Sequence, residues 1–462
     1  MKTINLKKTV LASSIALILG GFSAQAAVAD QSVRDEINDL KQRIEQLEMD
    51  LVDSQEAAKK QDRVKFSTKS GSPKMVSRDG KSSMELTGRV FLDTAALPSQ
   101  YAKGEVEDLV GSQNASEFRK LYLGVEGELW GVWEYELVFD FAEQDVDLKD
   151  ANIAYTGWDD QELKIGYQKP AFGLENTGSS RYTLFMERGL TDNFSPDRDL
   201  GLSWAYEQDW GGVKLGAFLP NSFIDGKLED HTEGETEDGD ELIPSVDSSE
   251  VDAITLTGRI TGAPIQSSSQ LLHLGGSVAH TAFKDPAKVK YDARPEVHLS
   301  EKLVASSVKG SDSTTAFGLE AAYSWKNLLL QGEYVHANID AGDSFGFDSY
   351  YLAGAYMLTG ESHPYKAKSG KFGQVRPDNP VSAGGWGAWE VALRYSAIDL
   401  NDGDELGGRM EDFTVGLNWY PENNLKAQLN YIHYDAKDYE DDSDFVARQK
   451  DDIVQARLAW YF

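Results

Sequence analysis

Alternation of apolar and polar residues dominates residues 84–462 and predicts β-strands. Within residues 121–129 every odd position is apolar or glycine, whereas the even positions carry Tyr, Gly and Glu. A tight connection at residues 130–132 follows, and the alternation resumes over residues 135–141. The same arrangement recurs over residues 317–339. We therefore expect a series of antiparallel hairpins and no helical domain in this part of the chain.

Three features favour a membrane barrel over a soluble sandwich. The polar faces carry full charges while the apolar faces end in aromatic residues, as in barrels with a polar interior. Short turns alternate with long polar connections, which we expect at residues 228–252 and 284–315. The last strand, residues 454–462, has one apolar face and ends on Phe462. At roughly 22–24 residues per strand and connection, residues 84–462 provide about 16 strands, which predicts an all-β transmembrane antiparallel β-barrel around an aqueous channel.

A second pattern precedes the barrel. Apolar residues from Val33 to Leu51 recur at alternating spacings of four and three, which predicts a short N-terminal coiled-coil helix within residues 27–60. Ile at a and Leu at d favour two strands, whereas residues 43–48 resemble a trimer-favouring motif. The alternative is an amphipathic helix that packs on its own domain, but the strict 3.5-residue period favours self-association. Residues 61–83 are expected to form a polar linker to the barrel domain.

Residues 1–26 have the organisation of a secretory signal peptide. Lys2, Lys7 and Lys8 precede an apolar stretch at residues 10–21, and Ala-Gln-Ala at residues 24–26 fits a cleavage site. A transmembrane anchor is the alternative, but the apolar run is shorter than the roughly 20 residues of a membrane-spanning helix. The sequence therefore predicts export from the cytoplasm.

Composition and charge exclude several classes of protein. The 462 residues include no cysteine, which excludes a disulfide scaffold, a Cys-ligated metal site and a thiol nucleophile. The net charge of −31 argues against nucleic-acid binding. We find neither a Gly-x-Ser-x-Gly elbow nor a His-Glu-x-x-His motif, so we expect no enzyme, no cofactor and no metal site. The low hydrophobic content of 40% suits a protein with a hydrated interior.

Several motifs in the barrel segment resemble the phosphate-selective porin O/P family. The resemblance covers essentially the whole barrel, and the run Ser179 to Arg188 is its most specific part. The motifs are Leu148 to Tyr155, Gly173-Leu174-Glu175, Ser179-Ser180-Arg181-Tyr182-Thr183-Leu184-Phe185-Met186-Glu187-Arg188, Phe194 to Gly201, Phe118 to Tyr122, Leu358 to Glu361, Gly387 to Glu390, Arg394-Tyr395-Ser396 and Asn418-Trp419-Tyr420. The resemblance implies a 16-stranded trimeric outer-membrane porin with an inward-folded constriction loop, a ladder of arginines and an anion site.

Carried over residue by residue, the resemblance suggests the lining of that site. The matching anion-binding and constriction residues are Ser179, Ser180, Arg188, Arg119, Lys120 and, with weaker support, Arg181 and Arg198. Arg119 and Lys120 stand where the family usually has Arg-Arg, and alternation directs Lys120 into the lumen and Arg119 outward unless the strand is bulged. Further lumen candidates by alternation are Arg89, Arg394, Lys426 and Arg457. The alternative for every one of these cations is a wall charge paired with an acidic neighbour.

The function expected from these features is passive diffusion of small hydrophilic solutes across a bacterial outer membrane, and the resemblance implies selectivity for phosphate or related anions. The expected partners are small anions, outer-membrane lipid and lipopolysaccharide, two further copies in a homotrimer, and the barrel-assembly machinery that reads the Phe462 strand. The N-terminal segment would lie in the periplasm. Acidic stretches at residues 229–252, 399–411 and 435–444 are expected in external loops, where they would repel anions or bind divalent cations. The alternative function is a structural protein that tethers the envelope through its coiled coil.

Overall fold

The computed structural model describes residues 29–60, 64–68, 71–98, 113–142, 146–220, 253–439 and 445–462. The chain divides into two compact units, residues 1–63 and residues 64–462. The expected signal peptide and the expected acidic connection at residues 228–252 lie outside the described residues.

The first unit contains one helix, α2 (Ala29–Lys60), among its described residues. The seam residues Ile37, Leu40, Ile44, Leu47 and Leu51 are 44–67% exposed in the single chain. A helix with an exposed apolar seam is consistent with the expected coiled coil, whose self-association stays a prediction. Among the described residues, no helix is long and apolar enough to cross a membrane.

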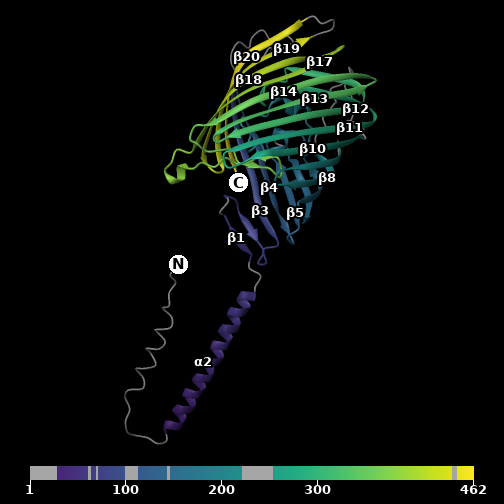
Figure 1. Cartoon of the computed structure of the whole chain (residues 1–462). Coiled ribbons are helices and arrows are strands. Elements are labelled where there is room, and N and C mark those ends of the chain that lie inside the picture. The colour runs from purple at the N-terminus through teal and green to yellow at the C-terminus, as the bar shows by residue number, and fades with distance from the viewer. Residues whose placement is uncertain are drawn as a thin grey trace, which may run out of the picture. The chain divides into compact units, whose positions relative to one another are not determined.

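The second unit is built around one antiparallel sheet (Figure 1). Its barrel strands are β3 (Ser83–Leu97), β4 (Gln113–Leu129), β5 (Trp133–Asp140), β6 (Asp147–Trp158), β7 (Gln161–Gln168), β8 (Asp199–Gln208), β9 (Gly211–Leu219), β10 (Ala253–Gln266), β11 (Gln270–Ala293), β12 (Val304–Trp325), β13 (Leu328–Ala341), β14 (Asp343–Met357), β17 (Ala388–Asp402), β18 (Glu405–Glu422), β19 (Leu425–Tyr439) and β20 (Phe445–Tyr461).

These strands close into a barrel. Each pairs with the next along the chain, β14 pairs with β17, and β20 pairs with β3. The sheet has 18 strands, of which β1 (Lys65–Ser67) and β2 (Lys74–Val76) form an appended hairpin and the other 16 form the barrel. The predicted 16-stranded barrel is therefore confirmed. The hairpin lies in the segment expected to be a polar linker, and β2 pairs with β3.

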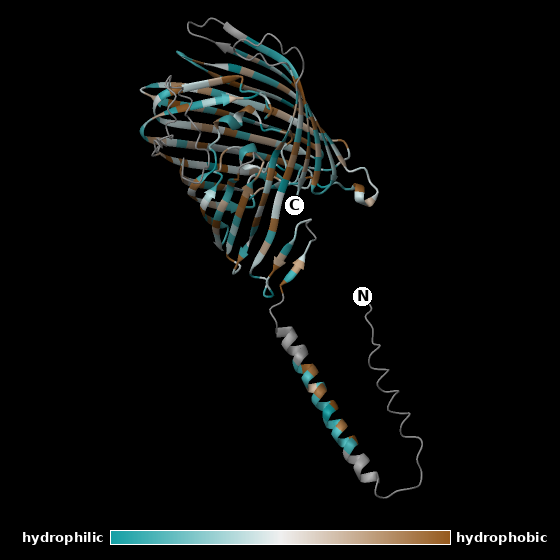
Figure 2. Ribbon diagram, turned by 180° about the vertical axis from the view of Figure 1, so that it is seen from behind, coloured by the Kyte–Doolittle hydropathy of each residue, from teal (hydrophilic) through white to brown (hydrophobic). Residues whose placement is uncertain are grey.

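The strands place apolar residues outside and polar residues inside. On β12, Leu319 is 64% exposed while its neighbour Glu320 is buried. On β20, Leu458 is exposed and Arg457 is buried in the lumen. Figure 2 shows this mixture of hydrophobic and hydrophilic residues along single strands. The predicted turn at residues 130–132 is also confirmed, and two successive residues in it, Trp130 and Gly131, have positive φ angles of 54° and 75°.

The connections differ from two expectations. The predicted long loop at residues 284–315 is wrong, because β11 continues to Ala293 and β12 begins at Val304. Residues 399–411 form a tight hairpin between β17 and β18, and not a loop. In both segments charged residues alternate with apolar ones, and the polar composition hid strands that cross-strand pairing stabilises. The two longest described connections, residues 169–198 and 358–387, are equal in length, and the second lies at the barrel end that carries the short turns.

Candidate functional site

Residues 169–198, which connect β7 to β8, fold into the barrel lumen and are called the inward loop below. The loop contains α3 (Leu174–Thr177) and the 3₁₀ helix η1 (Leu190–Phe194). Its large apolar side chains Phe172, Phe185, Leu190 and Phe194 are at most 3% exposed. Phe172, Leu190 and Phe194 pack in one cluster with lumen-facing alanines such as Ala337, and Phe185 packs in another with Ala353; these small side chains leave room for the loop.

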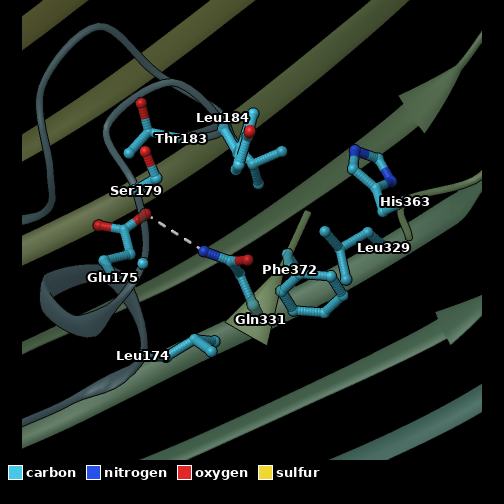
Figure 3. Close-up of a pocket in the computed structure, with 11 residues that line it drawn as sticks. Leu174, Glu175, Ser179, Thr183, Leu184, Leu329, Gln331, His363 and Phe372 are labelled. Carbon is cyan, nitrogen blue, oxygen red and sulfur yellow. Dashed lines mark hydrogen bonds between the residues drawn. The ribbon is translucent and has the colours of Figure 1, made fainter. Parts of the chain in front are cut away.

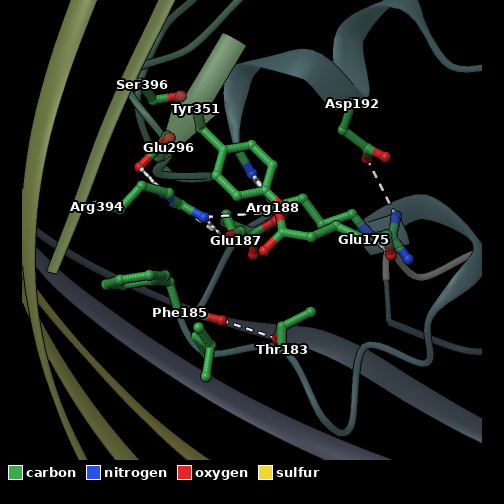
Figure 4. A network of polar contacts seen from close by, with 12 residues as sticks. Glu175, Thr183, Phe185, Glu187, Arg188, Asp192, Glu296, Tyr351, Arg394 and Ser396 are labelled. Carbon is green, nitrogen blue, oxygen red and sulfur yellow. Dashed lines mark hydrogen bonds and ion pairs between the residues drawn. The ribbon is translucent and has the colours of Figure 1, made fainter. Parts of the chain in front are cut away.

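Cations of the barrel wall hold the inward loop by its backbone (Figure 4). Arg394 donates from Nη1 and Nη2 to the carbonyl of Glu187 at 3.1 Å, and Lys426 Nζ donates to the carbonyl of Thr183 at 2.7 Å. Arg457 donates to the carbonyl of Met186 and forms ion pairs with Asp93 and Glu187. All three donate to carbonyls of the inward loop; Arg394 and Arg457 also pair with carboxylates, whereas Lys426 forms no ion pair with the described residues.

Arg188 is engaged inside the loop. Its Nε donates to the carbonyl of Glu175 at 2.9 Å, its Nη2 to the carbonyl of Gly178 at 3.4 Å, and its Nη1 pairs with Asp192 Oδ2 at 3.1 Å. Burial raises the pKa of the Asp192 carboxyl, but the charges of Arg188 and Lys169, together with hydrogen bonds from Arg188 and Asn176, outweigh burial and hold the pKa below its usual range. Every nitrogen of Arg188 thus has a loop partner, and its role as an anion ligand stays a prediction.

Arg119 reaches the lumen through a β-bulge. In the β3–β4 pair Phe91 lies opposite Lys120 and Leu92 lies opposite Phe118, so Arg119 is an extra residue. Its Nε and Nη2 bind the two carboxylate oxygens of Glu187 at 3.0 and 3.1 Å. Burial opposes ionisation of Glu187, but Arg119 and Arg457 hold its pKa below the usual range. Alternation alone directed Arg119 outward, and the bulge reverses that direction.

Three cations form a different group, the basic cluster of Arg89, Lys120 and Arg181. Arg89 Nη1 donates to Ser180 Oγ at 3.0 Å, and Arg181 Nη2 donates to Thr87 Oγ1 at 2.9 Å. Arg89 and Lys120 both lie over the ring of Tyr122, at 4.8 and 5.5 Å from its centroid. In the part of the chain that the structure describes, none of the three forms an ion pair, and both Nε atoms of the arginines lack a hydrogen-bond partner.

Ser179 and Arg198 lie beside this cluster in different roles. Arg198 pairs through two nitrogens with Asp150 at 3.3 and 3.2 Å. Ser179 Oγ accepts from the backbone of Arg181 at 3.4 Å and lines a cavity of about 40 Å³, in which Gln331 donates to Glu175 (Figure 3). That cavity is the size of about one water molecule, so it holds no hydrated anion.

A second segment, residues 358–387, also reaches into the lumen, which the sequence reasoning missed. It contains β15 (Tyr365–Lys366), β16 (Lys371–Phe372) and η2 (Val381–Ala383). Arg259 donates to the carbonyls of Ser369 and Gly370 at 3.3 and 3.0 Å, and His273 Nδ1 lies 2.6 Å from the hydroxyl of Tyr365. The family motif at residues 358–361 marked the start of this segment in the sequence, but it did not indicate whether the segment folds into the lumen or away from it.

The lumen around this segment is lined by lysines. A cavity of about 180 Å³ is lined by Lys164, Lys169, Lys214 and Lys371, together with hydroxyl and carboxylate side chains. Burial, together with the nearby charges of Lys214 and Arg259, lowers the pKa of Lys371 to about 7. The charge on Lys371 therefore changes near neutral pH.

Carboxylates gather on another part of the lumen wall. Glu85 lies directly opposite Glu126, which lies opposite Glu136, and Glu128 lies opposite Glu134. These residues line a cavity of about 350 Å³ close to the short turns. The pore thus carries a basic surface at the inward loop and an acidic surface nearer one mouth.

Comparison with known proteins agrees with this architecture. The model of a family described as phosphate-selective porin O and P matches residues 84–462, the segment expected to form the barrel. A protein of Caulobacter vibrioides described as uncharacterised is 31% identical over 370 residues, which cover 78% of this chain and 70% of the relative. Porin O of Pseudomonas aeruginosa is 25% identical over 403 residues, which cover 78% of this chain and 85% of that porin.

A solved structure shares the fold. OmpT, an outer-membrane protein of Vibrio cholerae, matches with a TM-score of 0.50 at 13% identity, covering 83% of this chain and 98% of OmpT. The family match places the chain among outer-membrane channels. With a closed 16-stranded barrel, a polar lumen and a family match over residues 84–462, this chain belongs to the phosphate-selective porin O and P family of bacterial outer-membrane channels.

Proposed function

We propose that this channel conducts small anions in preference to cations, and that phosphate-class anions bind transiently at the basic cluster. One observation carries the proposal: Arg89 and Arg181 are half-buried in the lumen, and no carboxylate of the described residues is paired with either guanidinium. An anion in the pore therefore meets unneutralised donors there, whereas Arg119 and Arg198 are already paired.

A phosphate that binds at the basic cluster exchanges water molecules of its hydration shell for hydrogen bonds to the protein. Each guanidinium presents planar donors that match two oxygens of a phosphate, Lys120 adds a point charge, and the hydroxyl of Ser180 adds a neutral donor. Conduction requires several moderate contacts in series, because a single deep site would retain the ion. The lysine-lined cavity supplies further moderate contacts along the same lumen.

The acidic surface of the lumen favours the opposite result, a preference for cations. The glutamates of β3, β4 and β5 attract cations and repel anions at one mouth, so selectivity depends on which surface dominates the narrowest part of the path. The measurement is the zero-current potential across a KCl gradient in a planar bilayer, followed by titration of inorganic phosphate. We expect anion selectivity and block of the chloride current by phosphate.

The double variant R89Q/R181Q tests the site. It should raise the phosphate concentration for half-block by at least tenfold, since two charge-assisted contacts are lost. Lys309→Gln on β12 removes a lumen-distant charge and is the matched control. Cation selectivity without phosphate block in the wild-type channel would contradict the proposal and leave a general porin.

A structural role for the N-terminal helix is the second candidate. The exposed seam of α2 supports a stalk that joins three copies in the periplasm or tethers the envelope. Deleting residues 29–60 should leave single-channel conductance unchanged and lower the temperature at which the oligomer dissociates on a gel. Conductance lost on deletion would contradict a purely structural stalk.

The remaining partner expectations belong with this proposal. A homotrimer, recognition of the last strand with Phe462 by the barrel-assembly machinery, and contact with outer-membrane lipid are each inferred from the family and the strand pattern. Phe462 pairs with Gly88 at the seam where β20 meets β3, with N–O distances of 2.9 and 3.1 Å. Removing Phe462 should therefore slow assembly into the membrane, which pulse-chase heat-modifiability measures.

A further inference from the structure

Three cations stand in one row across the outer face of β18, β19 and β20. Arg409 lies directly opposite Lys437, and Lys437 lies directly opposite Arg448. Their side chains point away from the lumen, because the neighbouring Met410 and Ala436 are the buried, inward residues of the same strands. Arg409 and Arg448 are 44% and 46% exposed at the side chain. We call these three residues the cation row.

The row is unusual for its charge. Like charges directly opposite each other on neighbouring strands destabilise a sheet, and this row holds two such pairs in succession. Arg409 pairs with Glu411 at 3.2 Å, and Arg448 pairs with Asp435. Lys437 in the middle forms no ion pair with the described residues. The chain as a whole carries a net charge of −31, so this local excess of positive charge stands out against the acidic remainder.

The height of the row on the barrel identifies what it faces. The apolar band on the same three strands ends, on the side of the cation row, with outward-facing residues that are 41–44% exposed: Phe413, Tyr431 and Val454. Arg409 lies four residues beyond Phe413, about 13 Å along the strand at roughly 3.3 Å per residue. Outward aromatic residues mark the edge of the hydrocarbon layer. The row therefore lies at the level of lipid headgroups on the side of the long strands.

We propose that the cation row binds the phosphate groups of an anionic outer-leaflet lipid of the lipopolysaccharide type. A phosphate beside Lys437 reduces the like-charge repulsion within the row. Lys437 supplies a cation that has no carboxylate partner among the described residues, and Arg448 can add a bond from Nη1, because its Nε and Nη2 are the nitrogens that bind Asp435. The lipid's acyl chains then lie along the apolar band below. This surface is on the outside of the barrel, so it is independent of the conduction proposed for the lumen.

The test measures binding of diphosphorylated lipid A, and of the same lipid without its phosphates, to the purified full-length protein by native mass spectrometry. The triple variant R409Q/K437Q/R448Q should weaken binding of the phosphorylated lipid about a hundredfold, and K437Q alone about fivefold, from the contribution of each basic residue near a charged membrane surface. Because Lys437 forms no ion pair with the described residues, K437Q removes a positive charge without breaking an ion pair of the folded barrel. Heat-modifiability on gels checks that each barrel is folded.

The matched control is R78Q/K81Q/K326Q, which removes three exposed cations at the opposite end of the barrel. We expect it to bind the phosphorylated lipid like the wild type. Equal binding of the dephosphorylated lipid, or equal loss in the control, would overturn the proposal. A change in oligomer mass of K437Q by light scattering, with lipid binding unchanged, would show that the row contacts a second copy and would overturn it as well.

Discussion

Lumen cations of this barrel differ in what their nitrogens contact. Arg394 and Arg457 are buried and donate to backbone carbonyls of the inward loop, so they stabilise its position. Arg89 and Arg181 contact only hydroxyl groups and aromatic rings among the described residues. A guanidinium whose donors are used binds an anion only by losing those partners, which costs several kcal/mol when the partner is a buried charge. The residue-scale predictions follow from this difference.

Replacing Arg188 by Ala should loosen the inward loop. The change leaves the Asp192 carboxylate without its ion-pair partner and two carbonyls without donors. Because the two side chains are 17% and 31% exposed, the local cost should be smaller than the roughly 3–5 kcal/mol of a fully buried pair. We expect larger open-channel noise with a phosphate block that resembles the wild type, recorded on single channels. R188K, which keeps the charge, is the control. A quiet channel that has lost its phosphate block would instead establish Arg188 as the anion ligand that the motif suggested.

The charge of Lys371 should make selectivity depend on pH. Its pKa of about 7 means that the amine is charged below pH 7 and neutral above it, so the preference for anions should rise as the pH falls from 8 to 6. Lys371→Met should remove this change in the zero-current potential. Lys368→Met is the matched control, because the ion pair of exposed Lys368 with Asp160 raises its pKa and keeps it charged throughout.

The same titration affects stability. The pKa of Lys371 is lower in the folded protein than the unfolded value near 10.4, so the folded state gains stability as the pH rises from about 7 to 10 and loses it as the pH falls. In urea unfolding, the stability of the wild type should therefore rise relative to that of Lys371→Met as the pH increases from about 7 to 10. A stability difference that stays constant over this range would contradict the burial of the amine.

At the scale of elements, the lumen is narrowed by two segments that no strand pattern marks. The inward loop enters from the end with longer connections, and residues 358–387 enter from the end with short turns. Phe372 of the second segment packs near Leu184 and Leu329, and it lines the same small cavity as the inward loop. The two segments therefore meet inside the barrel, and each restricts the space left to the other.

Replacing residues 364–373 by a Gly-Ser linker should widen the pore. The substitution removes β15 and β16 and the lysine at the lumen cavity, and it frees Arg259, which still has Glu320 as its partner. We expect a higher single-channel conductance in KCl and a weaker dependence of selectivity on pH. Tyr365→Phe, which removes only the contact to His273, is the mild control. Unchanged conductance would mean that the segment lies outside the conduction path.

At the scale of the whole molecule, the barrel has a polar interior and an apolar outer surface, which is the reverse of a soluble protein. Closure through the β20–β3 pair leaves no free barrel edge, which satisfies the backbone where water is absent. The outward residues of the strands are apolar over the band that meets lipid, and the inward ones include many charged residues, several of them held in buried ion pairs. Of two adjacent positions on one strand, the outward one should therefore tolerate apolar substitutions and the inward one polar substitutions.

Leu319→Arg tests this inversion. Leu319 is 64% exposed on the outer face of β12, within the apolar band, and an arginine there should destabilise the barrel by about 2–4 kcal/mol in lipid. Ser307→Arg, on the same face but far toward the loop end of β12, should cost less than about 1 kcal/mol. The measurement is reversible urea unfolding in lipid vesicles. Equal costs would mean that the face at Leu319 does not contact hydrocarbon.

The sequence by itself determined the barrel, its strand number and the direction of most side chains, because period-two alternation is a local property that each strand carries. It also marked Ser180, Arg119, Lys120 and Arg181 as lumen or loop residues. Tertiary structure decided what these residues contact. The bulge that turns Arg119 inward depends on register with β3, and the partners of Arg188 come from the folding of the loop on itself. Pairing between charges distant in sequence is set by three-dimensional closure, which no local pattern encodes, and so only the structure separated the paired cations from Arg89 and Arg181.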